Sequence, residues 1–184
     1  PIDIVQGPCL PVDADDVDTD QIIPARHLLR LSRTGLGAFA FERSGVRPMV
    51  EARSGAPILL GGRNFGCGSS REHAVWALAD RGVRVVIAPS LADIFAGNCA
   101  RYGVLALALP ESIVGNWRGR SMEDAGFSLR VDLRAQSVDD GEATHRFAVD
   151  PFARRCLLEG LDPIALTLGR NAVSYTHLTL PTIG

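Results

Sequence analysis

The stretch "PILLGGRNFGCGSSREHAVWALADRGVRVVIA", residues 57–88, decides the fold expected for this chain. It opens on a short apolar run at 57–62, bounded by Pro and Gly, which is typical of a buried strand. A turn rich in Gly and Ser follows, and apolar residues then recur at helical spacing over 74–78. A second apolar run, rich in Val and Ile, covers 83–88. The stretch therefore predicts a strand, a turn, a helix and a second strand.

Local signals mark the ends of the expected helices. Ser69 and Glu72 fit the S-x-x-E capping box, which predicts a helix start at Ser69, and Gly82 fits a C-terminal stop. The next segment repeats this pattern, with Ser90 as the expected cap and Gly103 as the expected stop. Alternating short strands and helices predict parallel strands joined by right-handed crossovers.

The remaining strands show a different pattern. An apolar run at 104–109 predicts a third parallel strand, whereas 127–138 and 144–150 alternate apolar and polar residues around the turn 139–142 and predict a hairpin. Residues 151–160 predict a helix with Pro in its first turn and Gly after it. The expected fold is therefore α/β, with a mostly parallel central sheet and antiparallel additions.

The beginning of the chain carries fewer signals. An apolar run at Ile2–Val5 predicts a strand. Residues 13–20 hold five aspartates, which suit a solvated loop and a functional loop equally well. Residues 42–55 are rich in Arg, Gly, Ser and Pro and predict an exposed connection.

Composition limits the classes of protein that this chain can belong to. Its 184 residues are 46% hydrophobic and 22% charged, with a formal net charge of −2, which suits one globular domain, expected over 1–172. The sequence has no stripe of basic residues that would indicate a nucleic-acid partner. It also has no apolar run long enough to indicate a membrane span. The N-terminal residues lack the pattern of a signal peptide, so we expect a cytoplasmic location.

The tail, residues 173–184, is expected to be non-native. Its stretch "VSYTHLTLPT" translates back into a sequence that resembles an adapter used in DNA sequencing. We therefore expect this tail to replace a native C-terminal helix, and no function is assigned to it.

The four cysteines, Cys9, Cys67, Cys99 and Cys156, are widely spaced and form no C-x-x-C pair. This spacing argues against a zinc or iron–sulfur site held by this chain alone. We therefore predict no metal site and reduced thiols.

The turn at 64–71, "NFGCGSSR", suits several kinds of site only in part. As a dinucleotide loop it has Gly66 and Gly68 but Arg71 where the third glycine is needed. A phosphate P-loop needs a lysine, and the chain contains none; a hydrolase elbow needs G-x-S-x-G, which is absent. Cys67 with His73 as its base lacks an evident orienting residue, so a small thiol that fills the turn is favoured over a nucleophile.

An anion site remains the favoured interpretation of this turn. Serine hydroxyls and free amides at a helix N-terminus attract negative charge. Arg71 in the first helical turn is unfavourable unless a carboxylate compensates it. Two possibilities stay open for that carboxylate. It belongs to a bound substrate, or it is a side chain of this chain, namely Glu72 or an aspartate of 13–20.

The same turn resembles the signature of the small subunits of 3-isopropylmalate dehydratase, in the aconitase superfamily. The resemblance extends in order through "DVDTDQIIPARHL", "RTGLGAFAF", "VVIAPSLADIFAGNCARYGVLAL" and "HRFAVDPFARRCLLEGLDPIALTL", and covers roughly residues 3–170. It implies the swivelling β/β/α domain of that superfamily. It also implies interconversion of 2- and 3-isopropylmalate by dehydration and rehydration, in leucine biosynthesis.

Residue by residue, the resemblance implies distinct roles for the turn. Ser69 is expected to act as the catalytic base for the proton next to a carboxylate, and Arg71 to bind a substrate carboxylate. Ser70 is expected to contribute its amide or hydroxyl to substrate binding. Glu72 is expected to cap the helix and His73 to be structural.

A second loop is expected to support the turn. Asp18, Thr19 and Asp20 are expected to approach from the other side of the sheet and to orient Arg71 or the serines. Arg26 is a candidate second contact for a substrate carboxylate.

The resemblance also implies a partner. No cofactor is expected on this chain, because the [4Fe–4S] cluster of the family is held by a separate large subunit. Two alternatives stay open: the small subunit of a related citraconate, methylmalate or homocitrate dehydratase, and a non-catalytic anion-binding regulatory domain.

Overall fold

The computed structural model describes residues 1–29 and 32–162 of the chain, and the expected non-native tail lies outside them. Seven strands form one sheet in the order β4-β3-β2-β1-β5-β6-β7. Their bounds are β1 Ile4–Pro11, β2 Ile58–Leu60, β3 Val85–Ala88, β4 Leu105–Ala108, β5 Ser128–Asp132, β6 Ser137–Asp139 and β7 Thr144–Arg146. The helices are α1 Thr19–Ile22, α2 Arg47–Ala52, α3 Glu72–Asp80, α4 Asp93–Arg101, α5 Glu111–Glu123 and α6 Pro151–Glu159, with 3₁₀ turns η1 Ala25–His27 and η2 Gly37–Phe39.

The expected fold class is confirmed. Strands β1 to β4 pair in parallel, and β5, β6 and β7 extend the sheet from β1 in antiparallel pairs. Gly82 and Gly103 follow α3 and α4 with φ of 102° and 74°, so both end their helices as predicted. None of the helices in the described ranges combines the length and the apolar character that a bilayer span requires.

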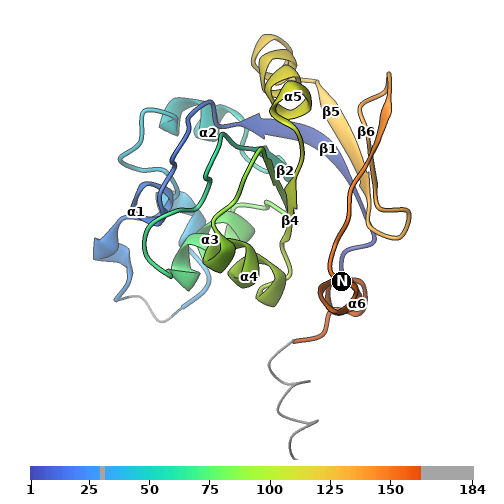
Figure 1. Cartoon of the computed structure of the whole chain (residues 1–184). Coiled ribbons are helices and arrows are strands. Elements are labelled where there is room, and N and C mark those ends of the chain that lie inside the picture. The colour runs from blue at the N-terminus through green and yellow to red at the C-terminus, as the bar shows by residue number, and fades with distance from the viewer. Residues whose placement is uncertain (30–31, 163–184) are drawn as a thin grey trace, which may run out of the picture.

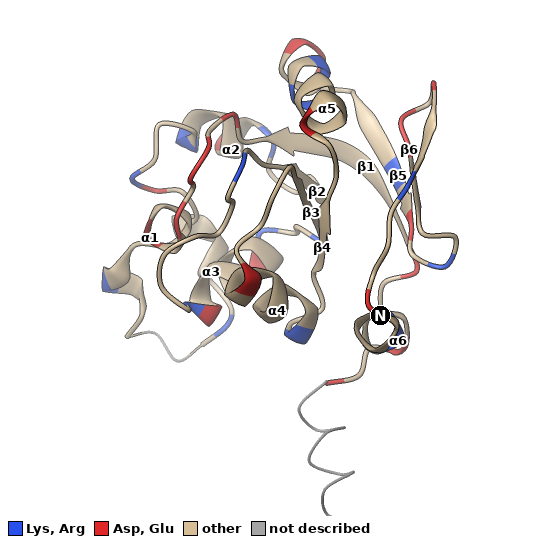
Figure 2. Cartoon of the chain, in the orientation of Figure 1, with Lys and Arg blue, Asp and Glu red and all other residues tan. Residues whose placement is uncertain are grey.

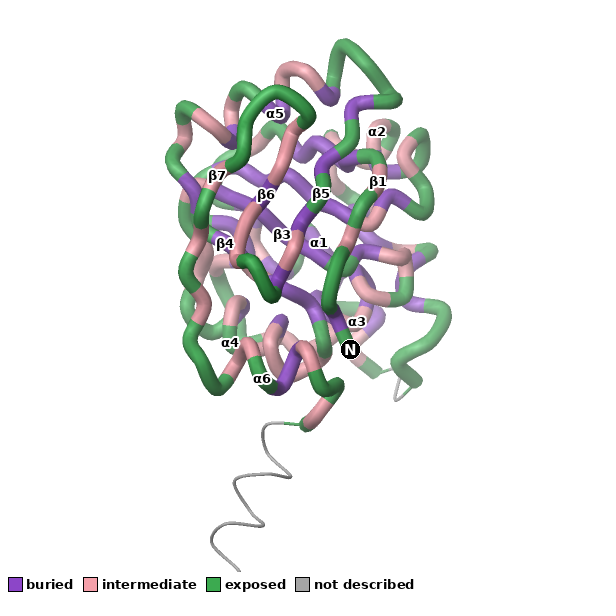
Figure 3. Tube along the Cα trace, turned by 90° about the vertical axis from the view of Figure 1, so that its right-hand side faces the viewer, coloured by how far each residue is buried: buried purple, intermediate pink, exposed green. Residues whose placement is uncertain are grey.

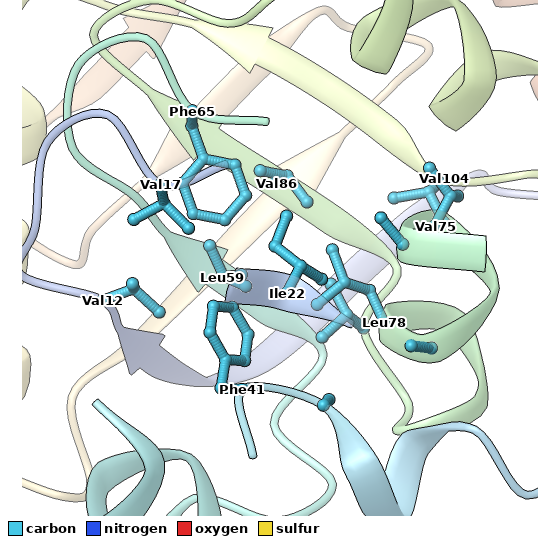
Figure 4. Close-up of a cluster of buried hydrophobic side chains, with 14 of the residues drawn as sticks. Val12, Val17, Ile22, Phe41, Leu59, Phe65, Val75, Leu78, Val86 and Val104 are labelled. Carbon is cyan, nitrogen blue, oxygen red and sulfur yellow. The ribbon is translucent and has the colours of Figure 1, made fainter. Parts of the chain in front are cut away.

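The two faces of the parallel sheet bury two separate hydrophobic cores. On one face, register aligns Leu10, Leu59 and Val86, which pack against α1, α2, α3 and α4. Figure 4 shows this core, with Phe41 and Phe65 closing over Leu59 and Val17. Alternation along the strands thus fixes which side chains meet the four helices.

The other face packs against α5 and α6. Ile58, Val85 and Leu105 face Val114 and Trp117 of α5, and α6 adds Leu157. In Figure 1, α5 lies on the side of the sheet opposite α3 and α4. Figure 3 shows the buried residues of the central strands in the middle of the molecule, surrounded by exposed segments. Charged residues lie outside β2, β3 and β4 (Figure 2).

Both predicted helix starts are wrong. Helix α3 begins at Glu72 after Arg71, and α4 begins at Asp93 after Ala92, and neither preceding residue makes a side-chain capping bond. The hydroxyl of Ser90 instead accepts a hydrogen bond from the amide of Asn64, at 2.8 Å. Tertiary contacts between loops therefore take the place of the local caps that the sequence pattern indicates.

Other predicted boundaries also need correction. The expected strand 127–138 is two strands, β5 and β6, because a turn at 133–136 with Gln136 at φ 51° interrupts it. The expected connection 42–55 contains the short helix α2. Helix α5, for which no expectation was formed, carries Gly115 and Gly119 and lacks a clear apolar stripe.

Two loops leave the same edge of the sheet and pair along their lengths. These are the β1 loop, residues 12–18, and the β2 loop, residues 61–71. Successive backbone bonds join them: Val12 N to Leu60 O at 2.8 Å, Asp16 N to Arg63 O at 2.8 Å, Gly66 N to Val17 O at 2.7 Å and Thr19 N to Cys67 O at 2.9 Å. The pairing continues the parallel arrangement of β1 and β2 past the ends of both strands.

The pairing requires glycine at position 62. A Cβ added there would lie 2.1 Å from the carbonyl oxygen of Ala14, which belongs to the backbone of the other loop. No real Cβ tolerates that distance, so any side chain at this position must push the two loops apart.

We predict that Gly62→Ala destabilises the chain by about 1–3 kcal/mol, because the added methyl group overlaps backbone rather than a movable side chain. The matched control is Gly119→Ala in α5, where an added Cβ meets no atom within 4 Å. That control should be neutral or about 0.5–1 kcal/mol more stable, as alanine is the better helix former. Urea unfolding measures both variants, and equal free energies of unfolding for Gly62→Ala and the parent would contradict the close approach.

Candidate active site

The turn 64–71 is held in a conformation that only a few residue types accept. Gly66 and Gly68 have φ of 80° and 91°, and Asn64 has φ of 53°. A Cβ on Gly66 would lie 2.2 Å from the ring of Phe95, so this glycine also permits contact with α4. The turn thereby delivers Ser69 and Ser70 to the surface just before α3.

The backbone of Ser69 is fixed by Thr19, the first residue of α1, directly after the β1 loop. Its carbonyl oxygen accepts a hydrogen bond from the Thr19 hydroxyl at 3.0 Å and another from the Arg71 amide at 2.8 Å. Thr19 is buried, while Ser69 is exposed. The serine therefore presents its side chain to solvent from an anchored backbone.

Arg71 pairs with Asp20 across the two loops. Its Nη1 donates to Asp20 Oδ1 at 2.6 Å, and the same oxygen accepts from the amide of Ala25 at 3.0 Å. The Arg71 side chain is 20% exposed and that of Asp20 is 55% exposed. The guanidinium of Arg71 is the main reason that the pKa of Asp20 lies below its usual value. An aspartate of 13–20 thus compensates this arginine, which is one of the two possibilities that the sequence left open.

Asp18 and Thr19 approach the turn as expected, but from a different direction. The predicted approach from the other side of the sheet is wrong, because β1 and β2 are parallel and both loops leave their carboxyl ends. Asp18 caps α1 by accepting from the amide of Gln21 at 2.7 Å. The functional roles proposed for these two residues remain predictions.

Arg26 makes other contacts. Its Nη2 forms an ion pair with Glu42, and its Nε contacts His27 Nε2 at 3.3 Å. His27 is buried against the ring of Phe39 at 4.1 Å and bonds the other oxygen of Glu42 at 2.8 Å. The Arg26 side chain is 52% exposed. In the structure Arg26 is thus paired with Glu42, and its role as a contact for a substrate carboxylate remains a prediction.

Glu72 does not cap α3, so that expectation is wrong. Its carboxylate pairs with Arg101 and accepts a hydrogen bond from the Tyr102 hydroxyl at 2.6 Å. These partners lie at the end of α4, so Glu72 ties the start of one helix to the end of the next. The His73 ring packs on Trp76 at 4.4 Å, which agrees with a structural residue.

The cysteines are unsuited to nucleophilic or cluster chemistry. Burial, followed by the nearby charges of Asp18 and Asp16, raises the pKa of Cys67 and keeps it a thiol. Burial raises the pKa of Cys9 to about 12, and it also raises that of Cys99. Within residues 1–29 and 32–162, no three His, Cys, Asp or Glu side chains gather as a metal site would require.

Sequence reasoning missed the residues that hold the turn from a distance. Tyr102 and Arg101 bind Glu72, and Arg118 of α5 donates to the Gly61 carbonyl at 2.7 Å. No local pattern identifies such partners, because 29 to 57 residues separate them from their contacts. The Gly61–Gly62 pair is the only signal in the sequence that indicates close packing at this place.

Comparison with known proteins identifies the family of the chain. Residues 49–112 match the family model described as the aconitase C-terminal domain. The chain is 48% identical over 180 residues to the 3-isopropylmalate dehydratase small subunit of Rhodospirillum centenum, covering 91% of this chain and 88% of that protein. It is 42% identical over 182 residues to the small subunit of Novosphingobium aromaticivorans, covering 96% and 89%.

A solved structure shares the fold. The crystal structure of 3-isopropylmalate dehydratase from Methanocaldococcus jannaschii superposes with a TM-score of 0.74 at 25% identity, covering 94% of this chain and 98% of that chain. Identity above 40% over nearly the whole length of these relatives, together with the shared fold, is enough to assign the chain to a family. It belongs to the small-subunit family of 3-isopropylmalate dehydratase, hydro-lyases of the aconitase superfamily.

Proposed function

We propose that this chain supplies the base and a carboxylate-binding arginine for the interconversion of 2- and 3-isopropylmalate by dehydration and rehydration. One observation carries the proposal. Ser69 and Arg71 lie on a single anchored turn, and Arg71 is already paired with a carboxylate, that of Asp20. A substrate carboxylate matches the chemistry of that internal partner.

Each residue of the turn has a part in this scheme. Arg71 binds a substrate carboxylate and so places the neighbouring C–H bond beside Ser69. Ser69, as the alkoxide left when its hydroxyl proton has passed to solvent, takes that proton and becomes a hydroxyl again, and Ser70 adds its amide or hydroxyl to the carboxylate. A serine hydroxyl is a weak base, so the positive field of Arg71 and of the α3 N-terminus is needed to stabilise the negative charge of the alkoxide before it accepts the proton of the substrate.

A partner subunit completes the proposal. A large subunit holds the [4Fe–4S] cluster, which supplies a Lewis acid for the leaving hydroxyl group. The four cysteines of this chain are free in the structure, and Cys9, Cys99 and Cys156 are buried. They suit a reducing, cytoplasmic setting. Arg26 becomes a second carboxylate contact if the substrate replaces Glu42 as its partner.

Ser69→Ala tests the assignment directly. With the large subunit present, we expect kcat to fall by roughly 10²–10⁴, the usual contribution of a general base, while the complex stays intact. Steady-state assays with 2-isopropylmalate and size-exclusion chromatography measure both effects. The matched control is Ser128→Ala, which should leave kcat unchanged, because the Ser128 hydroxyl, at the start of β5, bonds only the Gly126 carbonyl just before that strand among the described residues. Near-normal turnover by Ser69→Ala would remove Ser69 from the mechanism.

Asp20→Asn tests whether Asp20 holds Arg71 in place. Asparagine keeps an oxygen for the amide of Ala25 but removes the charge that pairs with the guanidinium. Because Asp20 is half-exposed, we expect a moderate effect, a rise in KM of roughly three- to tenfold with a smaller change in kcat. A fall in KM would show instead that Asp20 competes with substrate for Arg71.

The same pair gives a pH dependence of known sign. The pKa of Asp20 is lowered in the folded chain, so the pair stabilises folding above the unfolded value of about 4 and loses this effect as pH falls through the lower folded value. The melting temperature of the parent should therefore exceed that of Asp20→Asn near pH 6, and the difference should shrink below about pH 4. A difference that stays constant over this range would exclude a charge effect.

A further inference from the structure

Arg118 is a buried cation in the middle of α5, on the face that packs against the sheet. Its side chain is 10% exposed. Helix α5 covers β1, β2 and β3 on the face of the sheet opposite α3. From that face Arg118 reaches the β1 loop and the β2 loop, which are together called the site loops below. An arginine at such a position needs close polar partners to offset the loss of water.

The partners of Arg118 lie at the first residues of both site loops. Its Nη1 donates to the Gly61 carbonyl at 2.7 Å, where the β2 loop begins. Its Nε lies 3.4 Å from Asp13 Oδ1, where the β1 loop begins. Its Nη2 donates to Glu111 Oε1 at 2.8 Å, about two helical turns earlier in α5. One guanidinium therefore contacts both loops and the helix.

The two peptide groups that flank the Cα of Gly61 are both held by hydrogen bonds. Its amide donates to the Ile87 carbonyl at 2.8 Å, which extends the pairing of β2 with β3, and its carbonyl accepts from Arg118. The next residue, Gly62, is the point of closest approach to the β1 loop. Arg118 thus fixes the peptide orientation at the root of the loop that ends in Ser69.

Stability alone is a poor reason for an arginine here. Replacing a buried ion pair by an apolar side chain of similar volume is often neutral or stabilising, and α5 is already anchored by Val114 and Trp117. A planar guanidinium offers what an apolar side chain cannot, namely several donors in fixed directions. Fixed directions matter most where two loops must keep one relative placement.

We propose that Arg118 is a positioning residue for Ser69, because its guanidinium clamps the first residues of both site loops from beneath the sheet. This inference rests on the proposed function of Ser69. Arg71 has its own tether in Asp20, so loosening the root of the β2 loop displaces the serine more than it weakens carboxylate binding. Displacement of a catalytic group by about 1 Å is enough to slow a reaction by up to roughly 10².

Arg118→Met is the main test, assayed in the complex with the large subunit. Methionine fills the space of the arginine stem but offers no donor to Gly61, Asp13 or Glu111. We expect kcat to fall roughly tenfold while KM changes less than about twofold. Arg118→Lys, which keeps a charge and one donor, should recover part of kcat.

Arg53→Met is the matched control. Arg53 also reaches α5, where its Nη2 donates to the Ser121 carbonyl at 2.7 Å, and its Nε, like that of Arg118, is a buried donor without a hydrogen bond among the described residues. The hydrogen bond of Arg53 to Ser121 involves neither of the site loops. If Arg53→Met lowers kcat as much as Arg118→Met, the role is general stability and the proposal is overturned.

Hydrogen exchange tests the role of Arg118 independently of the proposed catalytic role of Ser69. Amides of 12–20 and 61–71 should exchange roughly fivefold faster in Arg118→Met, and not in Arg53→Met. Unchanged exchange in these loops would overturn the clamp even in an active complex. An inactive parent complex would count against the proposed function, while faster exchange would still support the clamp. If Arg118→Met fails to fold, Arg118→Lys and Asp13→Asn replace it in both measurements. Values of kcat and of exchange rates equal to those of the parent in both variants would overturn the proposal.

Discussion

The paired backbone of the β1 and β2 loops is the constraint on which the rest of the site depends. Parallel strands bring their carboxyl ends to one edge of a sheet, and here the hydrogen bonding continues beyond the strands to Thr19 and Cys67. The turn 64–71 is therefore an extension of the sheet rather than a free loop. Gly62 permits this approach and the two hydrophobic cores hold the sheet that supports it.

Charge in the site is balanced before any ligand arrives. A cation next to a helix N-terminus is unfavourable, and Asp20 offsets Arg71 at that place. Glu72, the first residue of α3, has the favourable sign for its position and pairs with Arg101. Carboxylates from two elements thus surround the turn, and each is tied to an arginine. Ser69 stands among these pairs as an uncharged group on an exposed surface.

The sequence predicted the parallel half of the fold well, because short apolar runs and helix-ending glycines such as Gly82 and Gly103 are local signals. Prediction from the sequence failed where contacts between residues far apart in the chain determine the partner of a side chain. The serines at 69 and 90 look like caps, but loop pairing uses Ser69 O and Ser90 Oγ instead. The pairing of Asp20 with Arg71 was among the expected possibilities, whereas Arg118 was not, since nothing near it in sequence indicates that it reaches Gly61. The partners of Arg26 were also unforeseen.

The double role of Asp20 Oδ1 has a consequence for ligand binding. This oxygen accepts from both Arg71 and the amide of Ala25, so a single atom joins the turn 64–71 to the junction between α1 and η1. The direction of the guanidinium is therefore set before any ligand arrives. An anion that meets an arginine already held in place costs the side chain less conformational freedom than one that must order it on binding.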